Sequence, residues 1–438
     1  MSTPPTPSSP QLVRAIGRWS MVALVINSIV GSGIFGLPST VAGLLGRASP
    51  LAVLLAGAGM GVIIACYAEV GSQFTRSGGT YLYLQRAFGR LIGVQVGWMF
   101  LLARLTGCAA AVNLFSAYLG EFWPAATQPL ARTFVNSAFV GTLAAVNCLG
   151  VGGGARMSNA AVVAKLLALG AVCAAGAVWL TIHAPTGSPD VAASPGHWVQ
   201  ATLLLLFAYG GYEAALAPMG EAHDPRRDVV FALWVALIVV TALYSTLQLL
   251  VISTLSDAAH STRPLADAAR VLLGRPGAAL ITCGALLSVY GYISANLLAA
   301  PRTLFALAEH GDFPAVLAVV HPRWRTPYVS IAVFALLVWV AAQLGSFSWN
   351  VTLSAVARVF YYAAVCAAVP VLRRIQPHAA AFRVPGGLLL PAAGVAICAV
   401  LVTGVDFSQS VVVLVTIAIA LANWAAVRAR RAPAVRTP

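Results

Sequence analysis

Long apolar stretches, separated by short polar segments, run through almost the whole chain of 438 residues. A membrane-spanning helix needs about 20 predominantly apolar residues, and twelve stretches meet this condition. We number them spans 1 to 12, and they cover residues 17–45, 50–72, 91–119, 132–150, 157–182, 197–221, 229–255, 277–309, 327–345, 349–372, 387–405 and 408–427. The pattern therefore predicts an all-α integral membrane protein with twelve transmembrane helices.

The two ends of the chain differ from this apolar region. Residues 1–13 are rich in Pro, Ser and Thr and are too polar and too short for a signal peptide. We expect them to form a disordered cytoplasmic tail. Residues 428–438 are basic and predict a second cytoplasmic tail. A single transmembrane domain is expected between them, over residues 14–427.

Composition excludes most soluble proteins. Hydrophobic residues make up 60% of the chain and charged residues only 9%, whereas an ordinary soluble domain carries about 25% charged residues. Such a chain could not cover a soluble surface, so a soluble enzyme and a nucleic-acid binder are both excluded. The seven cysteines all lie in apolar segments without a CxxC pair, which indicates core residues and neither a disulfide framework nor a metal site.

The net charge of +14 needs another explanation, and the positions of the arginines provide one. If the N-terminus is inside, 17 arginines lie in inside loops and tails and five in outside loops. Basic residues concentrate on the cytoplasmic side of membrane proteins. The distribution predicts a multi-pass protein of the plasma (cytoplasmic) membrane with both termini cytoplasmic. The positive charge then reflects orientation and contact with anionic lipid, with no nucleic-acid partner.

Two of the spans are interrupted near their midpoints. Span 1 contains Gly31, Gly33 and Gly36, and span 6 contains Gly210 and Gly211. Unwound backbone at this depth is tolerated only where it is buried or lines a cavity. The two spans lie five apart, an odd number, so two five-helix units would be inverted relative to each other. Paired glycine-interrupted spans point to the midplane site of a transporter; the alternative is that these glycines only allow close helix packing.

Lys165 is the only lysine of the chain and lies within span 5. A charged lysine at the bilayer centre costs about 2.5–3.5 kcal/mol on insertion scales. In a low dielectric a lysine releases its proton more readily than in water, which an arginine does not do. We therefore predict that Lys165 is a proton-coupling residue. The alternative is a lysine that snorkels to the membrane interface.

Four motifs occur in order along the chain. They are GSGIF at 31–35, SGGTYLYLQRAFG at 77–89, FAYGGYE at 207–213, and PRTLFALAEHGDFP followed by HPRWRTP within 301–327. On these residues the chain resembles the amino acid–polyamine–organocation family of permeases, from about residue 17 to residue 372. The resemblance implies an inverted five-plus-five repeat with unwound helices 1 and 6. The repeats would cover about 17–183 and 197–372, and 387–427 would add two helices.

The resemblance also implies an amino-acid substrate and the residues that hold it. Where span 1 unwinds, the second half-helix begins with unpaired N–H groups and a partial positive charge, which suit an α-carboxylate. Carbonyls left free around residues 207–210 and near Ile29 would accept hydrogen bonds from the α-ammonium. The substrate-binding residues implied in this way are Gly31, Ser32, Gly33, Ile34, Phe207, Ala208, Tyr209 and Gly210, with an aromatic lid among the last four.

Within the resemblance, Lys165 takes the place where sodium-dependent relatives bind an ion. Its expected neighbours are carbonyls of the span 1 break and Ser294 of span 8. Glu213 directly follows the span 6 break, where a buried carboxyl group could also carry or sense a proton. The coupling ion would then be the proton, and no cofactor is expected.

Arg104, in span 3, bears on the class of substrate. It could pair with Glu213, or it could meet a side-chain carboxylate of the substrate. Pairing is favoured, because two isolated buried charges would both be costly, and it predicts a near-neutral pocket and neutral amino acids. Glu69 in span 2 and Arg358 in span 10 could have a structural or a gating role, and the sequence leaves this open.

Several signatures are absent from the sequence. No histidine lies in the middle of a span, and there is no P-loop, Ser/His/Asp grouping or HExxH motif. The prediction is therefore a transporter that is not an enzyme, with proton-coupled uptake by alternating access favoured. The alternatives are an exchanger, an acidic amino-acid permease and, outside transport, a channel or a membrane enzyme. Either a monomer or a homodimer is compatible with the sequence.

Overall fold

The computed structural model describes residues 17–74, 79–150, 154–183, 191–215, 224–309, 311–377, 380 and 382–431. The predicted N-terminal tail lies outside these residues, as do 77–78 of the second motif. Within the described part of the chain, the regular elements are helices. The α-helices are α1 (Arg18–Ile29), α2 (Gly33–Leu45), α3 (Ser49–Ser72), α4 (Gly79–Phe88), α5 (Arg90–Leu119), α6 (Pro129–Leu149), α7 (Gly154–Ile182), α8 (Pro195–Tyr209), α9 (Tyr212–Ala215), α10 (Pro225–Thr254), α11 (Pro264–Glu309), α12 (Tyr328–Leu344), α13 (Phe347–Ile375), α14 (Leu389–Val402) and α15 (Phe407–Arg431).

Many of these helices are long and apolar enough to cross a membrane. Seven stretches in the described residues meet this condition, namely Gly33–Ser72, Arg90–Leu119, Val163–Ile182, Arg227–Thr254, Pro264–Glu309, Phe347–Ile375 and Phe407–Ala429. Large apolar side chains also point outward, as at Leu130, Leu167 and Leu344, which are 68–89% exposed. Such side chains suit lipid rather than water. The protein is therefore a multi-pass membrane protein.

Both predicted breaks are present. In span 1, α1 ends at Ile29 and α2 begins at Gly33. In span 6, α8 ends at Tyr209 and the short α9 begins at Tyr212. Gly211 has a φ of +114°, and a Cβ atom there would lie 2.2 Å from the backbone oxygen of Ser28. Only glycine allows this backbone conformation together with such a close approach of the two breaks.

Two segments differ from a simple span-and-loop pattern. The segment after span 2 contains a further helix, α4. The segment before span 8 is also helical, because it forms the first part of α11, which bends at Gly274, where φ is +67°. Pro276 follows this bend and begins the next helical segment without needing an amide hydrogen bond. At the other end of the chain, α15 continues to Arg431, four residues into the predicted basic tail.

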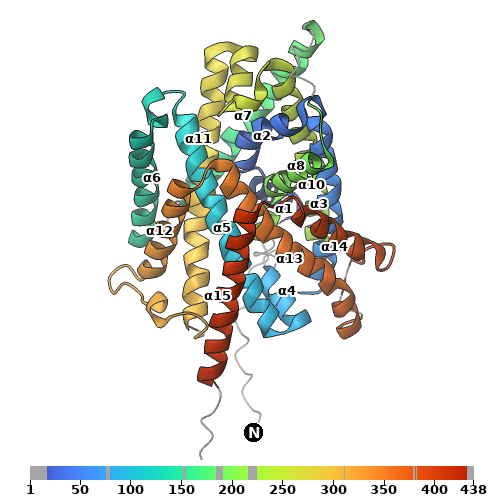
Figure 1. Cartoon of the computed structure of the whole chain (residues 1–438), viewed down its shortest axis with the longest axis vertical. Coiled ribbons are helices and arrows are strands. Elements are labelled where there is room, and N and C mark those ends of the chain that lie inside the picture. The colour runs from blue at the N-terminus through green and yellow to red at the C-terminus, as the bar shows by residue number, and fades with distance from the viewer. Residues whose placement is uncertain are drawn as a thin grey trace, which may run out of the picture.

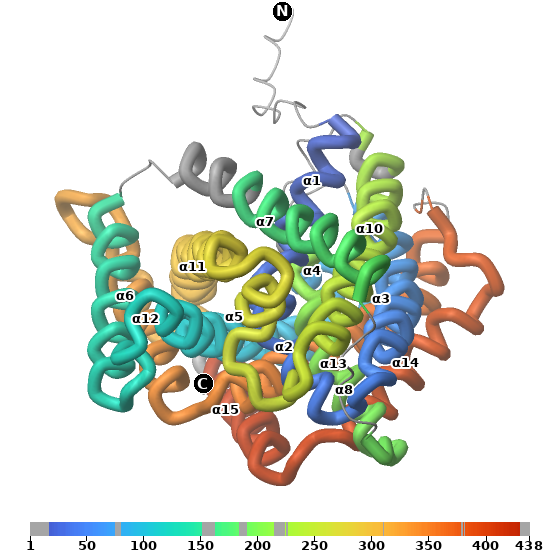
Figure 2. The backbone as a smooth tube through the Cα atoms, turned by 90° about the horizontal axis from the view of Figure 1, so that it is seen from above, coloured from blue at the N-terminus to red at the C-terminus, as the bar shows by residue number. Residues whose placement is uncertain are grey.

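The long helices run mainly along the longest axis of the molecule (Figure 1). Seen from above, α1 lies beside α10, and α6 lies beside α12 at the edge of the molecule (Figure 2). Helix α5 packs against both α11 and α13, and α2 packs against α8. The two broken spans therefore contact each other through α2 and α8, and α1 packs against the long helix α10.

Candidate substrate-binding site

A cavity of about 160 Å³ lies beside the two breaks. Its walls come from the end of α1, the segment after α8, and the facing sides of α5, α7, α11 and α13. The lining residues are Asn27, Ser28, Val30, Gly31, Phe100, Ala103, Arg104, Lys165, Gly211, Glu213, Leu287, Ser288, Gly291, Tyr292, Ala295, Asn296, Arg358 and Tyr361. Five features predicted from the sequence thus lie around one space, namely Gly31, Arg104, Lys165, Glu213 and the span 6 break.

Lys165 reaches across to the end of α1. Its Nζ atom donates hydrogen bonds to the backbone oxygens of Val30 at 2.5 Å and Asn27 at 3.2 Å. The last carbonyls of a helix have no partner within the helix and carry a partial negative charge. An ammonium group therefore fits this position, and these are carbonyls of the span 1 break, as expected. Lys165 is only 5% exposed, so it does not snorkel to an interface.

Ser294 does not belong to the lining of this cavity, and none of the Lys165 hydrogen bonds within the described residues involves it. Ser288, six residues earlier on α11, lines the cavity instead. Its buried Oγ atom has no hydrogen-bond partner among the described residues. The error has a simple cause, because the spacing to Pro301 gives a depth in the membrane but not the rotation of the helix.

Glu213 is held by four groups. Its carboxylate accepts hydrogen bonds from the Gly211 amide at 2.7 Å, from Tyr361 Oη at 3.0 Å and from Tyr362 Oη. Arg358 Nη1 lies 3.1 Å from Oε1 and forms a buried ion pair. The partner of Glu213 is therefore Arg358 and not Arg104, and the expected pairing was wrong. Gly210 makes room for this contact, because a Cβ atom there would lie 2.2 Å from Arg358 Nη1.

Arg104 lies elsewhere in the cavity wall. Its guanidinium group stacks over the ring of Phe100, one helical turn earlier on α5, with 4.5 Å between Cζ and the ring centroid. In the described part of the chain, no ion pair or hydrogen bond engages its side chain. The ring fixes the guanidinium plane but leaves its N–H groups available.

The predicted carboxylate subsite divides into two parts. Gly31 lines the cavity, whereas Ser32, Gly33 and Ile34 are buried at the start of α2. Gly33 packs directly on α8, since a Cβ atom there would lie 2.8 Å from the Cα atom of Ala208. The Ser32 hydroxyl has no partner among the described residues. Of these four residues, only Gly31, which lies in the break before α2, borders the open space.

The predicted carbonyl set around span 6 is largely occupied. Tyr244 Oη lies 3.2 Å from both the Ile29 and Ala208 oxygens, and the Phe207 oxygen accepts the Gly210 amide at 3.2 Å. Tyr209 donates its hydroxyl to Val53 of α3. None of residues 207–210 lines the cavity, and Phe207 lies under Arg358, with 5.7 Å between Cζ and the ring centroid. The aromatic wall consists instead of Phe100, Tyr292 and Tyr361.

The lining from α11 was missed at the sequence level. Ser288, Tyr292, Ala295 and Asn296 share one helix face, because they are spaced at four, three and one residues. A polar stripe on an otherwise apolar span was the available signal. Asn27, just before the first break, was a similar signal.

The packing is different on the two sides of the breaks. On the α2 side, the Tyr118 hydroxyl bonds to the Phe35 oxygen and Gln248 to the Pro38 oxygen. A Cβ atom at Gly36 would collide with Phe347 at 2.4 Å. The lining residues of span 1 belong to the α1 side. The space therefore borders α1, and the α2 side is closed.

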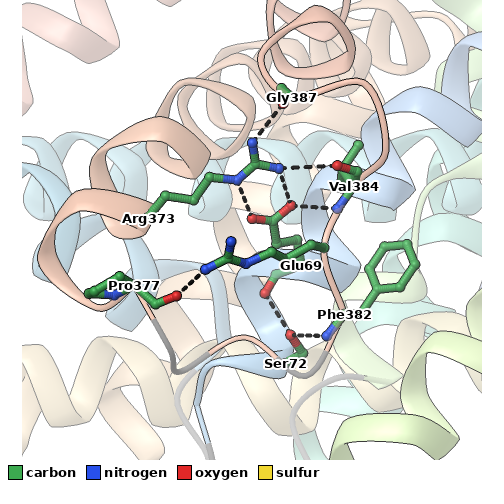
Figure 3. Close-up of polar contacts among 8 residues, drawn as sticks. Glu69, Ser72, Arg373, Pro377, Phe382, Val384 and Gly387 are labelled. Carbon is green, nitrogen blue, oxygen red and sulfur yellow. Dashed lines mark hydrogen bonds and ion pairs between the residues drawn. The ribbon is translucent and has the colours of Figure 1, made fainter.

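A second buried ion pair, between Glu69 and Arg373, lies apart from this cavity (Figure 3). Arg373 Nε and Nη2 reach the two carboxylate oxygens of Glu69 at 2.6 and 2.7 Å. The Val384 amide donates to Glu69 at 2.7 Å, and Arg373 also bonds to the oxygens of Val384 and Gly387. This pair joins α3, α13 and the segment before α14, so Glu69 has a structural role. Arg358, the other residue whose role the sequence left open, lines the cavity.

Two broken helices that enclose a small cavity with buried charges inside a multi-pass protein define the class of membrane transporters. The sequence matches the amino acid permease family over residues 16–425, and the chain belongs to this family. It is similar to the branched-chain amino acid permease BcaP of Bacillus subtilis, with 26% identity over 95% of this chain and 93% of that protein. It is also similar to the serine/threonine exchanger SteT of Bacillus subtilis, with 29% identity over 73% of this chain and 74% of that protein. An uncharacterized transporter of Mycobacterium tuberculosis is 29% identical over 81% of this chain and 79% of its own length.

Proposed function

We propose that this protein is a secondary active transporter that takes up amino acids together with protons by alternating access. The observation that carries the proposal is the position of Lys165. The only lysine of the chain places its Nζ on two carbonyls at the broken end of α1, beside the cavity. A transporter couples ion and substrate most directly when both act on the same broken helix.

The substrate would use the break for its α-groups. The N–H groups at the start of α2 suit the α-carboxylate, since that helix end carries a partial positive charge. The side-chain oxygen of Asn27, which lines the cavity at the end of α1, suits the α-ammonium. A wall of Phe100 and Tyr292 would then enclose the side chain. These contacts replace the carbonyls of 207–210, which have other partners.

Proton binding would control the position of α1. The protonated lysine stabilises the carbonyls at the end of this helix. Loss of the proton removes that positive charge and so weakens the attachment of α1 to α7. The closed α2 side and the space on the α1 side then correspond to one of the two states of alternating access. In this scheme the chain has twelve spans, and its two five-helix units are inverted relative to each other. A bundle of spans 1, 2, 6 and 7 moves against spans 3, 4, 8 and 9.

The test is uptake into proteoliposomes that contain the purified full chain. We expect a panel of radiolabelled amino acids to include at least one that accumulates under an inward proton gradient, and a sodium gradient not to replace it. Lys165→Ala should abolish accumulation but keep exchange of labelled for unlabelled substrate. Lys165→Arg keeps the charge but cannot release the proton, so it should also lose accumulation.

Either of two results would contradict the proposal. Concentrative uptake by Lys165→Ala would remove the lysine from the coupling mechanism. Failure of every amino acid to accumulate or exchange would favour the channel or membrane-enzyme alternatives.

Exchange of one amino acid for another is the second candidate function. The name of SteT describes an exchanger, which is the observation that favours it. Under exchange, wild-type protein would show no accumulation under a proton gradient but rapid uptake into liposomes preloaded with substrate. The names of BcaP and SteT both refer to neutral amino acids, so the panel of substrates includes branched-chain amino acids, serine and threonine.

A further inference from the structure

The cavity contains more positive than negative charge. Its lining includes three basic side chains, Arg104, Lys165 and Arg358, and one acidic side chain, Glu213. The surplus is two positive charges when Lys165 is protonated and one when it is neutral. A zwitterionic amino acid adds no net charge and would leave this surplus uncompensated. Buried charges without a partner are unfavourable.

The carboxylate of Glu213 cannot serve Arg104 as well. Its two oxygens already accept hydrogen bonds from Arg358, Tyr361, Tyr362 and the Gly211 amide. The other described acidic side chains do not line the cavity. Within the described residues, Arg104 is thus the basic group of this wall whose guanidinium has neither an ion pair nor a hydrogen bond, whereas Arg358 pairs with Glu213 and Lys165 bonds to two carbonyls.

The position of Arg104 also suits a ligand. Its guanidinium group lies over the ring of Phe100, and the buried Ser288 hydroxyl, which lines the cavity from α11, has no partner among the described residues. Both residues line the same cavity, Arg104 from α5 and Ser288 from α11. A planar guanidinium binds a carboxylate through two parallel hydrogen bonds.

We propose that Arg104 binds a carboxylate at the end of the substrate's side chain, so that the transporter selects acidic amino acids, with Ser288 as an additional hydrogen-bond donor. This rests on the proposed function, since it specifies the substrate of the same site. It departs from the neutral substrates named for BcaP and SteT. With Lys165 neutral, an acidic side chain brings the net charge of the occupied cavity to zero.

The experiment compares L-glutamate with L-glutamine, which have nearly the same shape and differ in the charge of the side chain. Both are tested as labelled substrates of the wild-type full chain in proteoliposomes, and as ligands that raise the melting temperature of the detergent-solubilised protein. We expect glutamate to be taken up at least tenfold more efficiently than glutamine and to give the larger thermal shift. L-aspartate should compete with glutamate, and L-leucine should not.

Variants then locate the selectivity. Arg104→Gln should lower glutamate uptake at least tenfold and raise the ratio of glutamine to glutamate uptake. Arg104→Lys should lie between it and the wild type, because the charge remains but the two-pronged geometry is lost. Arg302→Gln is the matched control, since Arg302 is also on a spanning helix but lies outside the cavity, and its ratio should stay that of the wild type.

The other possible results each contradict one part of the proposal. If wild-type protein transports leucine, serine or glutamine but neither takes up nor binds glutamate, the amino-acid transporter stands and the role of Arg104 is wrong. If glutamate is preferred but Arg104→Gln folds and keeps the same ratio, selectivity lies elsewhere. If no amino acid is transported or bound, the proposed function fails together with this inference. The wild-type comparison decides the matter even if Arg104→Gln does not fold.

Discussion

At the scale of single residues, the buried ion pair of Glu213 and Arg358 is the contact whose loss should cost much stability. Both side chains are buried, with exposed fractions of 4% and 7%. Removing one member of a buried pair leaves the other charge uncompensated and typically costs about 3–5 kcal/mol. Glu213→Gln and Arg358→Met should therefore each lower the melting temperature of the solubilised protein strongly. The double variant should recover much of that loss.

A second double variant tests the choice of partner. Arg104→Met combined with Glu213→Gln removes the same charges but leaves Arg358 without its carboxylate. We expect it to melt no higher than Glu213→Gln alone. Equal rescue by Arg104→Met and by Arg358→Met would show that the assigned pair is wrong. Thermal unfolding monitored by circular dichroism is sufficient for all four proteins.

At the scale of elements, the sequence locates the breaks well. Glycines at 31, 33, 210 and 211 are unfavourable inside a continuous helix. The helices do end beside them, at Ile29 and Tyr209. The resemblance to the permease family, and not the pattern of the chain, implies that Lys165 lies on the span 1 carbonyls, and its Nζ atom does bond to two of them. The sequence fails where rotation matters, because a span that is apolar all round gives no sign of which face turns inward. That is why Ser288 was missed in favour of Ser294, and Arg358 in favour of Arg104.

The contact between the two breaks gives a prediction about elements. A methyl group at Gly33 would meet the Cα atom of Ala208 at 2.8 Å, whereas one at Gly31 would meet Tyr292 at 3.7 Å and the Ile29 oxygen at 3.8 Å, which are ordinary van der Waals contacts. Gly33→Ala should force α2 and α8 apart, with an overpacking cost of about 1–3 kcal/mol, and should abolish transport. Gly31→Ala should fold like the wild type but reduce substrate affinity, because it narrows the cavity.

Melting temperatures and equilibrium substrate binding separate these two effects. Gly141→Ala serves as the control on α6, because a Cβ atom there meets nothing within 4 Å. The packing argument would be contradicted if Gly33→Ala and Gly141→Ala had the same stability and the same uptake.

At the scale of the whole molecule, the pair of Glu69 and Arg373 connects parts that are far apart in sequence. It fixes the segment before α14 to α3 and α13 through the Val384 amide and two backbone oxygens. Glu69 is completely buried, so Glu69→Gln should lower the free energy of unfolding by about 3–5 kcal/mol. The contact of α14 with α3 and α13 should loosen as a result.

Limited proteolysis together with thermal unfolding measures this effect. Asp257→Asn is the matched control, because Asp257 pairs with His260 at an exposed site, where an ion pair contributes about 0–1 kcal/mol. We expect Glu69→Gln to be cut faster between α13 and α14 and Asp257→Asn to behave as the wild type. Equal stability of the two variants would mean that the buried pair does not hold this segment.

The presence of a single lysine makes this protein a spectroscopic reporter of its own coupling site. Growth on lysine enriched in ¹⁵N would place exactly one labelled side-chain amine in the molecule, with no mutation and no added tag. Its chemical shift followed against pH would give the titration curve of Lys165 directly. If a substrate and a proton act on the same helix, adding the transported amino acid must displace that curve along the pH axis. If the titration curve does not move, substrate binding and proton binding at Lys165 are independent of each other.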